Sequence, residues 1–160
     1  VYMLFHGAST MTSQKSFYLT KEGLRALREE FETLRERRME YITEDSESRD
    51  ELELIEKRLH VLSEALQSHT LITLPKKHER DEVRLGATVL ARSKTTGKTE
   101  TLRLVGTFEA NPLLGTISDE SPFGQALLGH RVGDEVAHAT RADLRYVIEK
   151  ILYEPETHRA

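Results

Sequence analysis

The sequence contains no cysteine and no tryptophan. Because there is no thiol, disulfide bridges and cysteine chemistry are excluded, which suits a protein of the reducing cytoplasm. The sequence also lacks a run of about 18 apolar residues, the length that a membrane-spanning helix requires. We therefore expect a cytoplasmic protein that makes no contact with a membrane, and neither a disulfide scaffold nor a thiol enzyme.

Patterns that mark catalytic and metal sites are also missing. The seven histidines include no pair at the i,i+4 spacing of a zinc-binding helix. The glycines are spaced as turn residues rather than as a phosphate-binding loop, and no serine lies in a nucleophile elbow. We predict that the chain is not an enzyme in its own right and binds no cofactor tightly.

The charge is distributed unevenly along the chain. Charged residues make up 31% of the sequence and the net charge is −4, which argues against general binding of nucleic acid. Residues 20–74 contain 14 acidic and 9 basic side chains, whereas residues 83–153 contain 8 and 9. An acidic half followed by a nearly neutral half predicts two small modules with separate roles.

The first half has the heptad pattern of two helices that pack together. Apolar residues recur at steps of three and four on either side of a polar break, which predicts helices from about Lys21 to Ile42 and from about Ser48 to Gln67. A short break between two such stripes predicts an antiparallel hairpin. Thr20 is a candidate N-cap, and Gly23 is expected to mark close packing at the base. The stripes are Leu24, Leu27, Phe31 and Leu34, and Leu52, Ile55, Leu59, Leu62 and Leu66.

The break between the helices gathers carboxylates at the expected tip of the hairpin. Glu44, Asp45, Glu47 and Asp50 lie there with one nearby cation, Arg49. Such a cluster can chelate Mg²⁺ through one or two oxygens, but a partner would have to supply the remaining ligands and the substrate. The simpler interpretation, a tether or dimer seam with a solvated acidic loop, stays open at this point.

The second half changes to the patterns of short strands. Residues 87–92 and 100–105 read as strands joined by a turn, residues 115–118 as a third strand, residues 136–139 as a fourth and residues 144–152 as a fifth. Ser121 and Pro122 predict the start of a short helix, and Gly129 is placed to end it in the left-handed conformation. These patterns predict a small antiparallel sheet with one short helix, and thus an α+β protein.

The expected domains follow from these elements. We predict a disordered leader over residues 1–17, a coiled-coil hairpin over residues 18–74, a charged linker over residues 75–82, a C-terminal domain over residues 83–154 and a tail over residues 155–160.

Residues 121–134, SPFGQALLGHRVGD, contain Ser-Pro, a small-residue helix, Leu-Gly and Gly-Asp in succession. This stretch is similar to the signature of the Gre family of bacterial transcription factors (GreA and GreB), and it is the most specific of three stretches that resemble the family. Residues 19–30 resemble the start of the family's first helix, and residues 86–89 with 104–106 resemble the start of its C-terminal domain. The resemblance covers about Tyr18 to Tyr153. It implies an N-terminal coiled coil and a C-terminal domain of the FK506-binding-protein type.

The resemblance also implies a partner and a mode of action. Family members dock on RNA polymerase through the C-terminal domain and insert the coiled coil in the secondary channel, so nascent RNA and DNA are met only within that complex. The residues that would bind polymerase are Ser121, Pro122, Ala126, Leu127, Gly129, Gly133 and Asp134. The tip acids, Asp45 and Glu47 above all, would share the polymerase's Mg²⁺ during cleavage of backtracked RNA. A monomer is expected.

The tip departs from the family pattern, which is approximately Asp-x-x-Glu-Asn-x-x-Tyr. Here the break has neither that Asn nor that Tyr, and each arm is shorter by about eight residues, or ~12 Å of helix. A shortened relative that occupies the channel without stimulating cleavage is therefore an alternative. Two others are a prolyl isomerase with a helical appendage and a coiled-coil module unrelated to polymerase.

Overall fold

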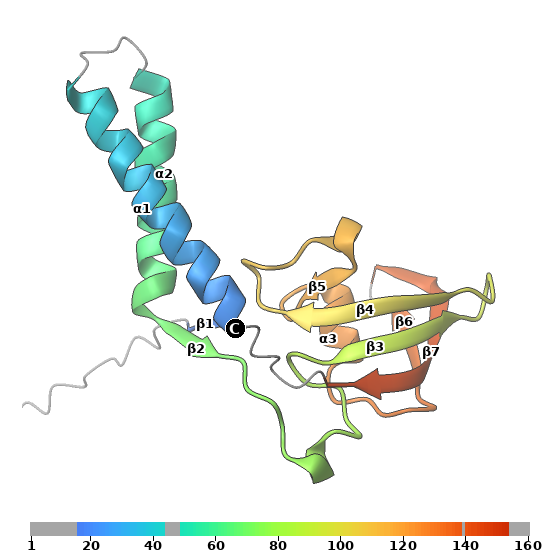
Figure 1. Cartoon of the computed structure of the whole chain (residues 1–160). Coiled ribbons are helices and arrows are strands. Elements are labelled where there is room, and N and C mark those ends of the chain that lie inside the picture. Colours follow the sequence, from blue (N-terminus) through green and yellow to red (C-terminus); the bar gives the residue numbers. More distant parts are fainter. Residues whose placement is uncertain (1–15, 44–48, 139, 154–160) are drawn as a thin grey trace, which may run out of the picture.

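The computed structural model describes residues 16–43, 49–138 and 140–153, and combines an upright helical hairpin with a curled mixed β-sheet (Figure 1). The fold is α+β, as predicted. In chain order the elements are β1 (Phe17–Leu19), α1 (Lys21–Thr43), α2 (Arg49–Gln67), β2 (His69–Leu71), η1 (Lys77–Glu79), β3 (Thr88–Ser93), β4 (Thr99–Val105), η2 (Pro112–Leu114), β5 (Thr116–Ser118), α3 (Pro122–Leu127), β6 (Glu135–His138) and β7 (Arg141–Leu152).

Helix α1 begins where the sequence predicts it. The Thr20 hydroxyl accepts a hydrogen bond from the Gly23 N–H at 3.0 Å, and the Thr20 carbonyl accepts from the Leu24 N–H at 2.9 Å. These bonds satisfy N–H groups that a helix start otherwise leaves without a partner. The predicted N-cap is therefore confirmed.

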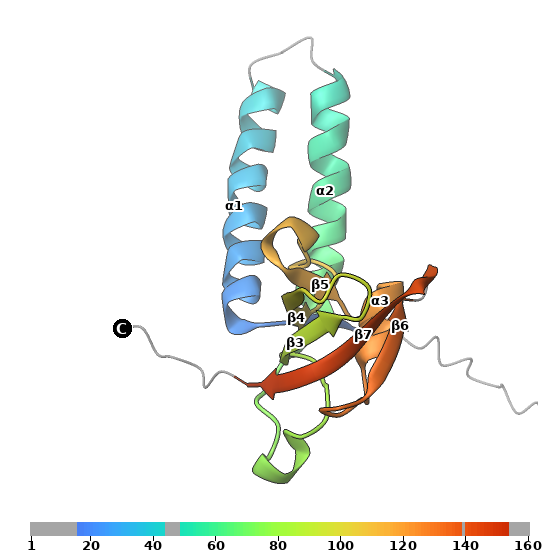
Figure 2. The same ribbon diagram turned by 90° about the vertical axis from the view of Figure 1, so that its right-hand side faces the viewer.

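The hairpin has an apolar base, and farther out buried Ile55 is accompanied by ion pairs between the two helices. Figure 2 shows α1 and α2 side by side along their length. The buried cluster of the base consists of Leu19, Leu24, Leu27, Leu62 and Ala65. Farther out, Arg58 donates two hydrogen bonds to Glu30 at 2.6 and 3.0 Å, and Arg38 donates one to Glu56 at 3.1 Å. The heptad stripes thus pair as predicted, most tightly near the base.

A two-stranded parallel sheet closes the base of the hairpin. Strands β1 and β2 pair in the register Phe17↔His69 to Leu19↔Leu71. Strand β1 was not predicted. It begins at Phe17, the last residue of the leader expected over residues 1–17, and the Ser16 and Thr70 hydroxyls are hydrogen-bonded beside it. The rest of the expected leader, residues 1–15, lies outside the described residues, as does the expected tail.

The sheet of the second half has the order β5-β4-β3-β7-β6. All neighbours are antiparallel except β4 and β5, which run parallel. The prediction of a purely antiparallel sheet is therefore wrong at this edge. Residues 106–115, which include η2, cross over instead of forming a hairpin turn, so β5 returns in the direction of β4.

Helix α3 covers one face of this sheet and completes its core. The Ser121 hydroxyl accepts from the Gly124 N–H at 3.0 Å, Pro122 stands in the first turn, and Gly129 has φ +83°. The predicted start and stop are confirmed. The buried residues include Val89, Leu104, Leu127 and Ile148.

At the end of β7 the Tyr153 hydroxyl donates to the Glu82 carbonyl at 2.5 Å and ties the linker to the domain. In the described part of the chain no helix has both the length and the apolar character needed to cross a membrane.

Candidate functional site

The tip of the hairpin lies between the end of α1 at Thr43 and the start of α2 at Arg49. Three of the predicted chelating residues, Glu44, Asp45 and Glu47, fall in residues 44–48, outside the described residues. The fourth, Asp50, lies in the first turn of α2 and is exposed. The C-terminal end of α1 and the N-terminal end of α2 lie at the end of the hairpin that is farthest from the sheet (Figure 1).

The acids next to the tip are engaged within the hairpin. Glu51 accepts a hydrogen bond from the Tyr41 hydroxyl, and Glu56 is paired with Arg38. The hydrogen bond and charge of Lys57, one turn along α2, lower the pKa of Glu53. Among the described residues, no three acidic or histidine side chains are gathered closely enough to hold a metal ion.

The residues of the 121–134 signature have mainly structural roles. Leu127 is fully buried, so its side chain packs in the core of the domain and supports this stretch from inside. Ser121 caps α3, and Gly129 and Gly133 take positive φ angles that other residues rarely adopt. Asp134 accepts from the Arg131 N–H at 2.8 Å, and this bond lowers the pKa of its carboxyl.

The remaining two residues of the set lie nearer the surface. Pro122 is exposed at the start of α3, and Ala126 is half-buried. Pro122 forms part of the rim of a groove of about 410 Å³ on the C-terminal domain. Inside the groove the Phe123 ring stacks on His138 at 4.9 Å between centroids and tilts against Tyr146 at 5.1 Å.

Two leucines next to this groove are almost fully exposed. Leu113 and Leu114 on η2 expose 95% and 79% of their surface, more than any other large apolar residue among those described. Pro112, which precedes them, lines the groove. In both ribbon views the segment with η2 projects from the sheet in the direction in which the hairpin extends (Figures 1 and 2). Sequence reasoning missed this feature, although an apolar triplet between Asn111 and Gly115 was a visible signal.

A second, larger cleft lies between the hairpin base, the linker and the C-terminal domain. Its volume is about 890 Å³, and its walls include Tyr18, Leu74, Arg84 and Asp119. Burial raises the pKa of the Asp119 carboxyl, and the charge of neighbouring Glu120 adds to the rise. The walls mix apolar and charged groups without a gathered set of catalytic or metal-binding side chains.

Comparison with known proteins finds relatives along most of the chain. Residues 77–153 match the family described as transcription elongation factor, GreA/GreB, C-term. The chain is 39% identical over 134 residues to transcription elongation factor GreA of Thermomicrobium roseum, covering 74% of this chain and 85% of that protein. It is 34% identical over 146 residues to GreA of Geobacillus kaustophilus, covering 81% and 92%. Among solved structures, GreA factor homolog 1 (Gfh1) of Thermus thermophilus is 28% identical, covers 86% of this chain and 99% of that one, and has a TM-score of 0.42.

The family match and the two GreA proteins confirm the resemblance seen in the sequence. The identity to the two GreA proteins extends over most of the length of both, so it is not limited to one shared domain. The family match to residues 77–153 contains both the 121–134 signature and the groove beside it. The chain belongs to the GreA/GreB family of transcription elongation factors.

Proposed function

We propose that this elongation factor binds bacterial RNA polymerase through its C-terminal domain and places the hairpin in the secondary channel. The observation that carries the proposal is an apolar surface, named the docking surface, which consists of the exposed residues Pro112, Leu113, Leu114 and Pro122 and the half-buried ring of Phe123. Family membership points to polymerase as the partner. The proposal includes a monomeric factor in the cytoplasm that meets RNA and DNA only inside the polymerase complex.

The physical argument for the docking surface is the cost of exposing apolar side chains. Burying a leucine side chain fully is worth about 1.5–3 kcal/mol, and Leu113 and Leu114 gain almost none of this within the chain. Exposed apolar groups beside a groove are typical of protein–protein interaction sites. Ala126, Gly129, Gly133 and Asp134 then support the surface by shaping α3 and the turn after it.

The finer description of the domain is also part of the proposal. A curled sheet that packs on one short helix, with an aromatic groove between them, supports a fold of the FK506-binding-protein type. The same groove favours a second candidate function, prolyl isomerisation, because its walls include Phe123 and Tyr146. A peptide isomerisation assay tests this candidate, and a rate equal to the uncatalysed rate would exclude it.

The proposed activity of the hairpin is stimulation of the RNA cleavage that polymerase itself performs. The factor would be an accessory protein, with Glu44, Asp45, Glu47 and Asp50 contributing oxygen ligands to the Mg²⁺ of the polymerase. A metal ion of this kind generates hydroxide and steadies an in-line displacement at phosphorus. The residues of this chain would supply and orient carboxylates there.

Two observations support another candidate function, a non-cleaving factor that only occupies the channel. Glu51 and Glu56, near the tip, are already engaged with Tyr41 and Arg38. The longer arm, α1, has 23 residues and spans about 34 Å. A carboxylate oxygen must come within about 2 Å of Mg²⁺ to coordinate it, so a tip that stops short of the metal could not contribute a ligand.

Binding to polymerase is tested with a double substitution on the docking surface. Leu113→Ser with Leu114→Ser should weaken the affinity for purified core RNA polymerase at least about tenfold, the equivalent of 1.4 kcal/mol. Leu152→Ser, at an exposed leucine at the end of β7 outside the hairpin and the docking surface, is the matched control and should bind normally. If the unsubstituted chain does not bind, the proposal fails and an interaction module unrelated to polymerase remains.

The two hairpin activities are separated with stalled, backtracked transcription complexes. The unsubstituted chain should accelerate RNA shortening, and alanine at Glu44, Asp45, Glu47 and Asp50 should abolish the acceleration while binding persists. Alanine at four exposed acids nearer the base, Glu22, Glu29, Glu32 and Glu36, is the charge-matched control. If the unsubstituted chain adds nothing to the intrinsic rate, the cleavage activity is excluded and channel occupancy is retained.

A further inference from the structure

The C-terminal domain touches the hairpin base at a joint formed by residues 106–109 and residues 17–23. A Cβ atom added to Gly106 would lie 1.8 Å from the Tyr18 carbonyl oxygen, so the two backbones are in direct contact. The Phe108 and Phe17 rings meet edge to face with centroids 5.1 Å apart. Phe108 thereby joins the buried cluster of the hairpin base rather than the core of its own domain.

Glu109 supplies the directional contact in this joint. One of its carboxylate oxygens accepts a hydrogen bond from the Thr20 N–H at 2.8 Å, and the other accepts from the Thr20 hydroxyl. The same hydroxyl accepts from the Gly23 N–H, so the carboxylate extends the cap of α1 from another part of the chain. A Cβ on Gly23 would lie 2.2 Å from the Glu109 carboxyl carbon, which means that Glu109 fills the place of a side chain.

We infer that Glu109 is a positioning residue, which fixes the direction of the hairpin relative to the C-terminal domain. A carboxylate at the N-terminus of a helix is favoured by the helix dipole, and its hydrogen bonds to N–H and hydroxyl groups are stronger than neutral ones. The two hydrogen bonds from Thr20 to Glu109 restrict the orientation of the hairpin relative to the C-terminal domain. The contact between the Phe17 and Phe108 rings has no such directional requirement, so by itself it would allow the hairpin to rotate. Without Glu109, the hairpin keeps its connection through the linker and its contact through Phe108, but not its fixed direction.

The turn that carries Glu109 is itself tied to the sheet. The Thr116 hydroxyl donates to the Glu109 carbonyl at 3.2 Å, and Thr107 bonds Glu120 at 3.0 Å. Thr116 begins β5, the strand that leads to Ser121 and the docking surface. Strand β5 therefore anchors both the turn that fixes the hairpin direction and the docking surface that is proposed to bind polymerase. This consequence for polymerase rests on the proposed function, but the fixed direction in the free protein does not.

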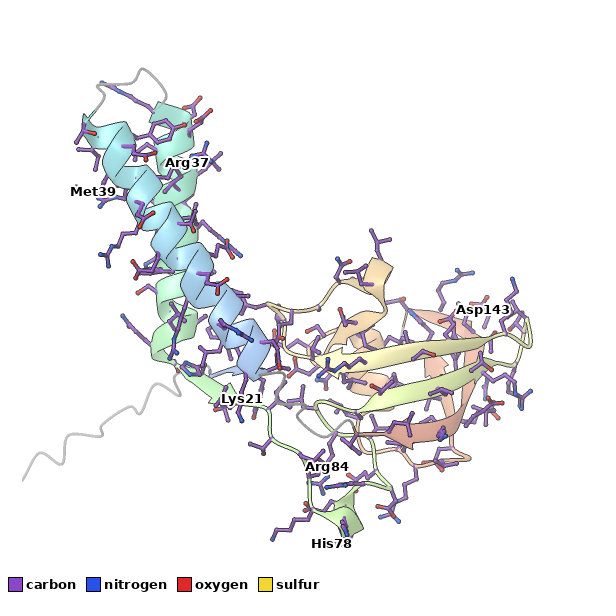
Figure 3. The ribbon with its side chains drawn as sticks, in the orientation of Figure 1. Lys21, Arg37, Met39, His78, Arg84 and Asp143 are labelled. Carbon is purple, nitrogen blue, oxygen red and sulfur yellow. The ribbon has the colours of Figure 1, made fainter. Side chains whose placement is uncertain are left out.

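The test is a distance distribution in the free protein. Because the chain has no cysteine, the double substitution Met39→Cys with Lys98→Cys provides two thiols for spin labels. Met39 lies in the outer part of α1 (Figure 3), and Lys98 lies in the turn between β3 and β4. Pulsed electron paramagnetic resonance should give one narrow distribution. Glu109→Ala should widen it by a factor of about two or more, as an unfixed joint samples further orientations.

Glu22→Ala is the matched control. Glu22 is an exposed acid in the first turn of α1, where the dipole acts, but no hydrogen bond or ion pair to the C-terminal domain is recorded for it among the described residues. It should leave the width unchanged, and circular dichroism should show both variants folded. Equal widths for Glu109→Ala and the unsubstituted chain would overturn the inference, and so would equal widening by Glu22→Ala.

A second substitution separates positioning from a general loss of structure. Gly23→Ala places a methyl group where the Glu109 carboxylate lies, so by itself it should widen the distribution as Glu109→Ala does. In the Glu109→Ala background the space is empty, and Gly23→Ala should add no further widening. Independent, additive widening would contradict the inference. Because no polymerase is present, failure of this test leaves the proposed function standing, and failure of polymerase binding leaves this inference standing.

Discussion

Leucine has opposite roles at two positions of the C-terminal domain. Leu127, the last residue of α3, is fully buried in the core of the domain, whereas Leu113 on η2 is 95% exposed. Leu127→Ala should lower the free energy of unfolding by about 2–5 kcal/mol, because it removes packed methyl groups and leaves a cavity. Leu113→Ala should change it by less than about 0.5 kcal/mol. Chemical denaturation measures both, and a comparable loss at Leu113 would show that η2 packs on the chain.

Asp119 should make stability depend on pH in a defined direction. Burial raises the pKa of its carboxyl above the ordinary value, so the folded chain binds this proton more tightly than the unfolded chain does. Its contribution is therefore unfavourable above the raised pKa and vanishes below the ordinary one. Asp119→Asn should raise the melting temperature near pH 7 and leave it unchanged near pH 3.

Asp143→Asn is the control for this pH dependence, since Asp143 is an exposed carboxylate on β7. It should change the melting temperature little at either pH. A drop in melting temperature for Asp119→Asn at neutral pH would contradict the account, because it would mean that the ionised carboxylate stabilises the fold.

At the residue scale, the sequence predicted local roles and missed distant ones. Thr20 and Ser121 were recognised as caps because each bonds an N–H three residues away. The close packing expected at Gly23 was right, but its partner could not be named. Glu109 lies 89 residues from Thr20, and no local pattern connects them.

At the element scale, the apolar base holds the hairpin together. Leu62 on α2 is fully buried, whereas Leu54 on the same helix is 65% exposed. Leu62→Ala should cost about 2–5 kcal/mol and lower the helical signal, since isolated helices of this length are marginal in water. Leu54→Ala should leave the thermal transition in circular dichroism nearly unchanged. Equal effects would mean that the stripes do not pair as described.

The strand predictions failed where pairing depends on other parts of the chain. Periodicity located β3, β4, β6 and β7 to within a few residues. It did not reveal β1, whose three residues form a strand only because β2 lies alongside. It also could not give the direction of β5, which is set by the path of residues 106–115 over the sheet.

At the scale of the whole molecule, three features act together. The hairpin extends away from the sheet domain (Figure 1), the docking surface is formed by η2 and the start of α3 on that domain, and the joint at Glu109 connects the domain to the hairpin. The change of charge and period along the sequence predicted two modules. The angle between them depends on contacts across the joint and could not be predicted.

The most direct test of the whole account maps the position of the hairpin on polymerase. Met39→Cys provides a single thiol on the distal part of α1, where the Met39 side chain is 54% exposed. A reagent attached to this thiol that cleaves nearby protein backbone identifies the polymerase segments that lie close to it. In the complex with core RNA polymerase, the account predicts cuts in the segments that surround the catalytic Mg²⁺. Cuts confined to the outer surface of polymerase, or none in a complex shown to form, would contradict it.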